Sequence, residues 1–247
     1  MKYEELRQYI TSVLKTIVRP RGRYSFLAQL KQNCEIFDIG CGNNSPFLIK
    51  NTLPYCIYTG IDIVDCDQET LKLADKYIVA DQDTFADEIF KFHECFDAVI
   101  SSHNIEHCND REKTLAAMLQ AIKPPGQLFM AFPSESSVGL PSREGCLNYY
   151  DDGTHLFSPP DFEKFIRTIT TSGFTIEYAA KQYKPSLDWV RGLINEPTSR
   201  KQNKVIAGTW AYHGFESIIW AKKLLLDRPR RIVREPPFTH QKSGDFA

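Results

Sequence analysis

The feature that most constrains this chain is a short apolar run that ends beside an acid and then turns on two glycines. Residues 35–39 read Glu-Ile-Phe-Asp-Ile, a pattern that predicts a buried strand, and Gly40 and Gly42 follow it directly. Glycine lets the backbone turn sharply and lets a ligand approach the main chain without meeting a Cβ atom. We therefore expect a turn that binds a nucleotide-like ligand, with an ordinary strand-to-helix turn as the alternative.

Missing motifs narrow the choice of nucleotide. A dinucleotide fingerprint needs a third glycine or alanine three positions after the second glycine, where this chain has Ser45. No Gly-Lys-Ser/Thr sequence follows that would complete a Walker loop. Asp38, just before the turn, repels phosphate and suits a cationic ligand. The pattern favours a nucleoside ligand without phosphates.

Acids also end the next two predicted strands. The run 56–62 ends in Asp62, and the short run 77–80 is followed by Asp81 and Gln82. A carboxylate at the tip of the second strand can accept hydrogen bonds from both hydroxyls of a ribose. Asp81 would lie at the same edge of the sheet, where it could accept from an adenine amino group. The alternative for Asp62 is a helix cap or a turn residue, since Asp favours both places.

Taken in order, these motifs resemble those of the class I S-adenosylmethionine-dependent methyltransferases, and most closely the methyltransferase type 11 group. The likeness extends through residues 96–107, Phe-Asp-Ala-Val-Ile-Ser-Ser-His-Asn-Ile-Glu-His, and covers roughly residues 34 to 133. It implies S-adenosylmethionine as the cofactor and says little about the methyl acceptor. The cofactor-binding residues that the resemblance implies are Asp38, Gly40, Cys41, Gly42, Asp62, Ile63, Asp81, Gln82 and Ser102.

The order of elements predicts an α/β fold. Seven apolar runs, near 35–39, 56–62, 77–80, 96–101, 127–132, 174–178 and 215–221, read as strands, and helices are expected near 46–52, 69–75, 84–92 and 110–122. Alternating strands and helices imply a Rossmann-like sheet, mostly parallel with a terminal antiparallel strand and helices on both faces. We expect one domain over residues 1–226, which opens with an amphipathic helix over 3–18, and a basic, flexible tail over 227–247.

Two segments depart from this alternation and are expected to bind the substrate. Residues 134–157 are polar and aperiodic, and 184–209 form an insertion with a short amphipathic helix. Between them, Ser158 followed by Pro159 and Pro160 predicts a capped helix start, and that helix should end near Ser172 and Gly173.

Composition is that of an ordinary globular enzyme. The 247 residues are 42% hydrophobic and 25% charged, with a formal net charge of −1, which gives no overall attraction to nucleic acid or to an anionic membrane. The seven cysteines form no Cys-x-x-Cys pair, which favours reduced thiols over disulfides or zinc. No apolar run reaches membrane-spanning length and no signal peptide opens the chain, so a cytoplasmic location is expected. No sequence feature predicts an oligomeric state.

Two histidines are the candidates for a catalytic base. His103 follows the fourth predicted strand, where an acceptor would meet the methyl group, and His155 lies in the segment expected to bind substrate. A base that removes a proton from an oxygen or nitrogen acceptor adds about 10²–10⁴-fold to the rate. The alternative for each is a structural histidine that hydrogen-bonds its loop.

A metal site is a less favoured alternative that uses His103, Glu106, His107 and His155. The pattern is similar to the Glu-x-x-Glu-His…His site of small-RNA 2′-O-methyltransferases and to the acidic pattern of ubiquinone-pathway O-methyltransferases, although here His103 replaces a glutamate. Imidazoles with one carboxylate would favour zinc or iron over magnesium.

The sequence thus predicts methyl transfer to an oxygen atom of a small or carbohydrate-like acceptor, without a nucleic-acid partner. Metal-assisted methylation of RNA and a non-catalytic binding subunit are the alternatives. Tyr149, Tyr150, His155 and Trp189 are candidates for the acceptor pocket. Arginines in that pocket would indicate an anionic acceptor; the candidates are Arg143 and the arginines at 19, 21 and 23.

Overall fold

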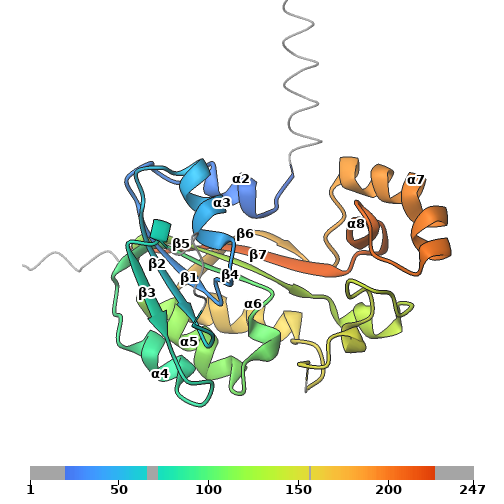
Figure 1. Ribbon diagram of the computed structural model, residues 1–247. Coiled ribbons are helices and arrows are strands. Elements are labelled where there is room, and N and C mark those ends of the chain that lie inside the picture. Colours follow the sequence, from blue (N-terminus) through green and yellow to red (C-terminus); the bar gives the residue numbers. More distant parts are fainter. Residues whose placement is uncertain (1–19, 66–71, 156, 226–247) are drawn as a thin grey trace, which may run out of the picture.

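The computed structural model describes residues 20–65, 72–155 and 157–225, and these build a seven-stranded sheet between two layers of helices (Figure 1). The strands are β1 (Glu35–Ile39), β2 (Ile57–Asp62), β3 (Lys76–Val79), β4 (Phe96–Ser102), β5 (Ile122–Pro133), β6 (Phe174–Ala180) and β7 (Glu216–Lys223). Their order across the sheet is β3-β2-β1-β4-β5-β7-β6. The predicted fold class is confirmed.

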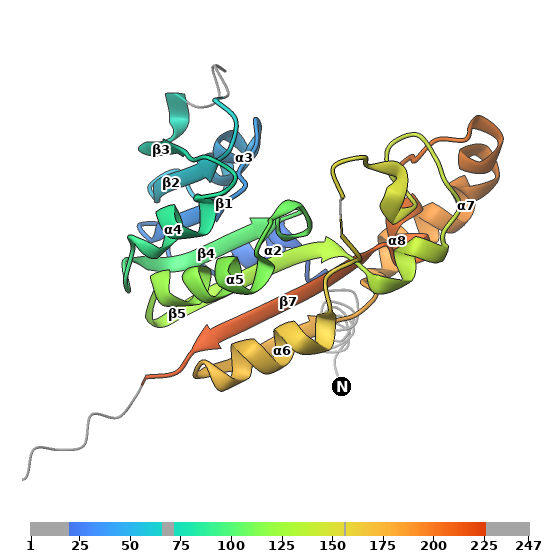
Figure 2. The ribbon, with the colours of Figure 1, turned by 90° about the horizontal axis from the view of Figure 1, so that it is seen from below.

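The last strand in the chain is the antiparallel one, and it lies inside the sheet. β7 pairs antiparallel with β5 on one side and with β6 on the other, whereas β1 to β5 are parallel to one another. Figure 2 shows β7 running along the sheet beside β5. This insertion brings Glu216, the first residue of β7, opposite Pro133 at the end of β5.

Alternating side chains explain why both faces of the sheet are covered. In β1, Phe37 and Ile39 belong to one buried cluster, while Ile36 belongs to the other. The first cluster packs under α4 (Phe85–Phe90), α5 (Arg111–Ala121) and α6 (Phe162–Thr171). The second packs under α2 (Arg23–Leu27) and α3 (Ser45–Thr52), on the opposite face (Figure 1). A strand buried on both faces is expected for a parallel sheet.

The segments expected to bind substrate are more structured than the sequence indicated. Residues 134–157 contain two 3₁₀ helices, η3 (Glu135–Gly139) and η4 (Tyr149–Asp151). The insertion after β6 contains α7 (Ser186–Gln202), which has 17 residues and is longer than the short helix predicted, and α8 (Thr209–His213). Figures 1 and 2 place α7 and α8 together at one end of the sheet.

Two local predictions were wrong. The cap of α6 is Asp161 and not Ser158, because the Asp161 side chain accepts from the amide of Lys164 and both prolines precede the cap. The strand predicted over 127–132 begins earlier, at Ile122, directly after α5 ends at Ala121, so the prolines at 124 and 125 lie within β5. The helix predicted over 69–75 lies partly outside the described residues, and no α-helix occurs in the described part, 72–75.

The helix predicted over 3–18 and the tail over 227–247 lie outside the described residues. The six cysteines within the described ranges are all free thiols, as predicted. No helix among the described residues combines the length and the apolar character that crossing a membrane requires.

Candidate functional site

The turn after β1 brings the predicted glycine loop and Asp62 into direct contact. The amide of Gly42 donates to Oδ2 of Asp62 over 2.8 Å, and Oδ1 of the same carboxylate accepts from the amide of Ile63 over 2.8 Å. Gly40 and Gly42 have φ angles of +68° and +56°, in the left-handed region that favours glycine. The two motifs predicted to share one ligand therefore lie side by side.

Asp38 is an internal anchor of this loop. Its side chain is buried, accepts from Tyr58 Oη over 3.0 Å and from Ser45 Oγ, and forms an ion pair with Arg23 of 2.7 Å. Ser45 begins α3, so the contacts join the end of β1 to the start of the following helix. Asp38 therefore orders the loop from within, and its predicted contact with a cofactor stays a prediction.

Cys41 packs beneath the same loop. Its thiol is buried, and a Cβ atom added at Gly60 would lie 2.9 Å from its Sγ atom, so β2 passes close to it. Burial, with the nearby charges of Asp38 and Asp62, raises the pKa of the Cys41 thiol well above its ordinary value of 9.0. Cys41 is therefore a neutral thiol that helps to pack the turn.

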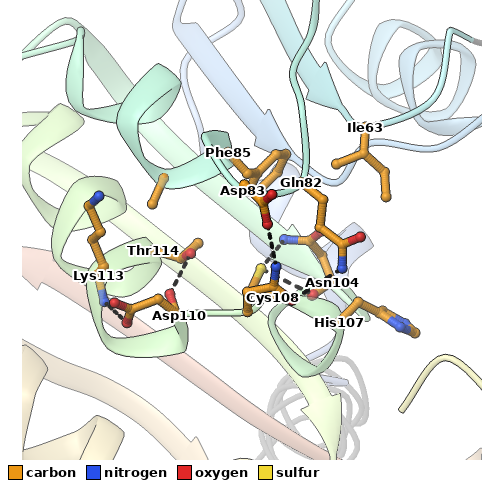
Figure 3. Close-up of a pocket in the computed structure, with 12 residues that line it drawn as sticks. Ile63, Gln82, Asp83, Phe85, Asn104, His107, Cys108, Asp110, Lys113 and Thr114 are labelled. Atoms are coloured by element: carbon orange, nitrogen blue, oxygen red, sulfur yellow. Dashed lines mark hydrogen bonds between the residues drawn. The ribbon is translucent and has the colours of Figure 1, made fainter. Parts of the chain in front are cut away.

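A cavity of about 200 Å³ opens beside the loop (Figure 3). Its walls come from the ends of β2 and β3 on one side and from the turn after β4 on the other; they include Ile63, Gln82, Asp83, Asn104, His107 and Cys108. Gln82 Nε2 donates to Asn109 Oδ1 over 3.3 Å, and Asn109 Nδ2 donates to Asp83 Oδ1 over 3.1 Å. The volume is below the range of sites for whole drug-sized ligands, so it suits a single ring system.

The other predicted cofactor-binding residues lie around this cavity at the same sheet edge. Asp81 follows β3 with an exposed side chain, and Ser102 is the last residue of β4. Neither lines the cavity. Their assigned contacts with a cofactor stay predictions.

Asn104 is a residue of this site that the sequence reasoning missed. A Cβ atom added at Gly40 would overlap Asn104 Cγ, so the side chain of Asn104 packs directly on the glycine loop. Its Nδ2 also contacts Cys108 Sγ over 3.7 Å. Asn104 stands within the stretch 96–107 that carried the family resemblance, but only the packing links it to Gly40.

His103 lies between two carboxylates. Its Nδ1 is 3.3 Å from Glu106 Oε1 and its Nε2 is 2.7 Å from Glu216 Oε1. Burial alone would lower the pKa of His103, but the hydrogen bonds and charges of Glu106 and Glu216 outweigh it and raise the pKa to about 10. An imidazole with this pKa is protonated at neutral pH, which works against the predicted role of His103 as a base. That role stays a prediction.

Glu106 is a buried carboxylate that pairs with His103 through Oε1 and has no other hydrogen-bond partner among the described residues. It belongs to the 3₁₀ helix η2 (Ile105–His107), and one ligand atom each from Glu106, His107 and His155 lies within 4.8 Å of the others. Three of the four residues of the predicted metal site thus come together. The fourth, His103, instead forms its ion pairs with Glu106 and Glu216.

The two histidines of this cluster, His107 and His155, are both available as nitrogen ligands. His155 Nδ1 lies 2.5 Å from the carbonyl oxygen of Tyr149, to which it donates, so in the neutral imidazole the lone pair is on Nε2. His107 Nδ1 contacts Thr154 Oγ1 over 2.9 Å, so the nitrogen of His107 that can act as a ligand is Nε2. Burial, together with the neighbouring His155, lowers the pKa of His107 in spite of the opposing charge of Glu106.

None of the cavities lined by described residues brings together the residues predicted to form an acceptor pocket. Arg143 is buried and makes two hydrogen bonds, of 2.9 and 2.6 Å, with Glu196 on α7. Tyr149 is buried against His155, Tyr150 is 60% exposed, and the Trp189 ring packs on Tyr212. Among the N-terminal arginines, Arg19 lies outside the described residues, Arg21 lies over the rings of Tyr178 and Trp220, and Arg23 pairs with Asp38.

Comparisons with known proteins agree with this geometry. Residues 37–130 match the family model described as "Methyltransferase domain". The chain is 25% identical, over 229 residues, to the mitochondrial ubiquinone biosynthesis O-methyltransferase of Mus musculus, covering 86% of this chain and 53% of that protein. It is 29% identical, over 143 residues, to the ubiquinone biosynthesis O-methyltransferase of Saccharophagus degradans, covering 54% of this chain and 57% of that protein. The chain therefore spans about half the length of these curated relatives.

A solved structure has the same fold. The S-adenosylmethionine-dependent methyltransferase from Mesorhizobium loti superposes with a TM-score of 0.53 at 16% identity, over 79% of this chain and 94% of that one. At this identity the likeness concerns the fold alone.

Proposed function

We propose that this chain, whose residues 37–130 match a methyltransferase domain, is a class I S-adenosylmethionine-dependent methyltransferase that transfers a methyl group to an oxygen atom of a small, polar acceptor. The O-methyltransferase relatives support oxygen as the accepting atom. The carbohydrate-like character of the acceptor rests on the sequence prediction.

The observation that carries the proposal is the contact between Gly42 and Asp62, because Ile63, the residue after Asp62, lines the cavity. Gly42 has open space in the direction of a Cβ atom, with no other atom within 4 Å, so a ligand can lie against the main chain there. Asp62 would bind the ribose hydroxyls, and Ile63, Gln82 and Asp83 would surround the adenine ring. The cradle, the acid and the ring-sized cavity all fit S-adenosylmethionine.

Bound S-adenosylmethionine supplies an electrophilic methyl group on a sulfonium that leaves as a neutral thioether. The protein's own contribution is to align the acceptor with that methyl group, which can supply about 7–11 kcal/mol of the barrier reduction. A hydroxyl acceptor must also lose its proton as the new bond to carbon forms. We assign this proton to Nε2 of His155, because the hydrogen bond to Tyr149 holds the proton of His155 on Nδ1.

Titration calorimetry with S-adenosylmethionine and S-adenosylhomocysteine tests the proposal. We expect both to bind the purified full chain in the micromolar range and to raise its Tm. A thermogram without heat of binding at high micromolar ligand, with an unchanged Tm, would reject methyl transfer and would favour the non-catalytic binding subunit instead.

The cluster of Glu106, His107 and His155 favours a second candidate, in which a metal holds the acceptor oxygen. A buried carboxylate that is paired only with His103 among the described residues, next to two imidazole nitrogens, is a ligand set that suits zinc, which binds two His and one Glu in several hydrolases. Such a metal would lower the pKa of the acceptor hydroxyl and would replace His155 as the means of deprotonation. Elemental analysis together with dialysis against a chelator separates the two candidates, because only the metal-assisted reaction stops without metal and returns when zinc is added.

RNA is the acceptor that the sequence associates with such a metal. The basic tail that would support RNA binding lies outside the described residues. Methylation of a small-molecule acceptor that is indifferent to added RNA oligonucleotides would exclude that alternative. The cytoplasmic location stays a prediction.

A further inference from the structure

A second cavity, of about 350 Å³, lies at the start of β7, between that strand and the α7–α8 insertion. Its lining includes Tyr183, Asp188, Trp210 and Glu216. We infer that this cavity binds the acceptor and selects for a molecule that carries an ammonium group beside its hydroxyls, such as an amino sugar. The inference rests on the proposed methyl transfer and specifies its substrate class.

The cavity adjoins the place where the methyl group is expected. Glu216 lines it and forms the 2.7 Å ion pair with His103, the residue that follows β4. The next residue in the chain, Asn104, packs on Gly40 of the glycine loop. The acceptor cavity and the cofactor loop are therefore separated by two adjacent residues of one turn.

The charges that face the cavity are negative. Asp188 and Glu216 line it, and no Lys or Arg does so among the described residues. His103 is the cation that pairs with Glu216 on this wall, and it is shared between Glu106 and Glu216, so two carboxylates offset a single positive charge. An anionic acceptor would meet unbalanced negative charge here, whereas an ammonium group would be stabilised.

The arginines that would have favoured an anionic acceptor are used elsewhere. Arg143 is paired with Glu196, and Arg23 is paired with Asp38. Arg21 is stacked over Tyr178 and Trp220, and only its backbone amide reaches the cavity wall, where it donates to Tyr183 Oη over 2.7 Å. Within the described residues, the cavity therefore has no guanidinium with which to bind a phosphate or a carboxylate.

An aromatic ring held in place by its neighbours completes the site. Trp210 Nε1 donates to the carbonyl oxygen of Cys146 over 2.8 Å. The Trp210 ring stacks with Phe215, at 4.7 Å between centroids, and packs at a tilt against His103, at 5.1 Å. A fixed indole can bind the apolar face of a sugar or lie against a cation, so it suits both parts of the inferred acceptor. The volume is at the lower end for ligand sites, which fits a monosaccharide-sized molecule.

Three sugars of the same size and different charge test this inference: glucosamine, glucose and glucuronate. Their affinities are measured by calorimetry at pH 7 on the full chain saturated with S-adenosylhomocysteine. We expect glucosamine to bind at least about tenfold more tightly than glucose, and glucuronate to bind most weakly. Equal binding of the three, tighter binding of glucose or glucuronate, or no binding of any would overturn the inference.

Variants show whether the two carboxylates cause the preference. Glu216→Gln and Asp188→Asn should each reduce the preference for glucosamine over glucose at least about threefold. Glu177→Gln, at an exposed carboxylate on β6 outside the cavity, should leave it unchanged. A preference that survives in both cavity variants would also overturn the inference. Asp188 is exposed, so its variant should retain the fold even if Glu216→Gln does not.

The same titrations on the chain without nucleoside separate this inference from the proposed function. A preserved preference for the ammonium sugar in a chain that binds no S-adenosylmethionine would reject methyl transfer and leave the cavity assignment standing. Binding of S-adenosylmethionine without a preference for the ammonium sugar would overturn the cavity assignment and leave methyl transfer standing.

Discussion

The amide of Gly42 donates to Oδ2 of Asp62 over 2.8 Å, so the glycine loop and the acid at the tip of β2 form one unit. Replacing Asp62 should therefore weaken cofactor binding in two ways, through the lost ribose contact and through a loosened loop. We expect Asp62→Ala to weaken S-adenosylmethionine binding about 10–100-fold, since hydrogen bonds to a charged group contribute about 1.5–3 kcal/mol. Asp62→Asn should have a smaller effect because its amide oxygen can still accept from Gly42.

The matched control for this experiment is Asp65→Asn, three residues further along the same turn and exposed. Titration calorimetry of the three variants gives the comparison. Equal losses of S-adenosylmethionine affinity in Asp62→Ala and Asp65→Asn would mean that binding depends only on the overall negative charge of the turn.

The two glycines of the loop should respond differently to alanine. Both have positive φ angles, so each substitution costs about 1–2 kcal/mol in backbone strain. At Gly40 the new methyl group also overlaps Asn104, whereas at Gly42 it projects into open space. Gly40→Ala should therefore lose about 1–3 kcal/mol more stability than Gly42→Ala. Gly42→Ala should keep the fold and weaken cofactor binding.

Thermal unfolding of both variants checks this expectation, and Asn104→Ala supplies an internal test. Removing the Asn104 side chain should restore part of the stability of Gly40→Ala and none of that of Gly42→Ala. The same restoration in both variants would contradict the packing of Asn104 on Gly40.

The ion pairs of His103 should make stability depend on alkaline pH. The pKa of His103 is raised to about 10 in the folded protein from an ordinary value of 6.5, so the folded state holds the proton more tightly. The stabilisation is complete below about pH 6.5 and is lost as the pH rises toward 10. His103→Gln should therefore destabilise the protein most at low pH, by about 3 kcal/mol, because it leaves Glu106 buried without its cation.

Urea unfolding of the wild type and of His103→Gln between pH 6 and pH 10 measures this difference. The two stability curves should converge toward pH 10. A constant difference over that range would show that His103 contributes by packing with Trp210 and Phe215 and not by charge.

If zinc occupies the cluster at Glu106, its content should depend on that carboxylate and on acid. Glu106→Gln should lower the zinc content of the purified chain at least about tenfold, whereas Glu112→Gln, at an exposed carboxylate on α5, should not change it. Because the pKa of His107 is lowered below 6.5, protons should displace the metal only at more acidic pH. Metal analysis after dialysis at pH 5, 6 and 7 gives this profile.

The sheet was predictable because its strands carry local signals. All seven predicted strands are present, since apolar runs and turn residues mark them without reference to the rest of the chain. The cap of α6 was misplaced because Ser158 and Asp161 are both good caps, and only the backbone geometry places Asp161 at the first turn. The length of α7 exceeded expectation because Pro197 lies within the helix and reads as a terminator.

The site was predictable only where its residues follow neighbouring strands of the sheet. The contact between Gly42 and Asp62 follows from two adjacent parallel strands that end at one edge. The partners of His103 could not be found this way, because Glu216 is 113 residues distant along the chain and reaches His103 only through the insertion of β7 beside β5. The ion pair between Arg143 and Glu196 could not be predicted for the same reason, and Arg143 was therefore expected in the acceptor pocket.

The position of β7 has a consequence for biosynthesis. A ribosome makes the chain from its amino end, so β1 to β5 are available before Glu216 has been synthesised. Until then, β6 lacks the strand with which it pairs and His103 lacks its second carboxylate. The nascent protein can therefore acquire a cofactor cradle early, but the neighbouring wall that contains Glu216 matures only when translation has passed the final strand.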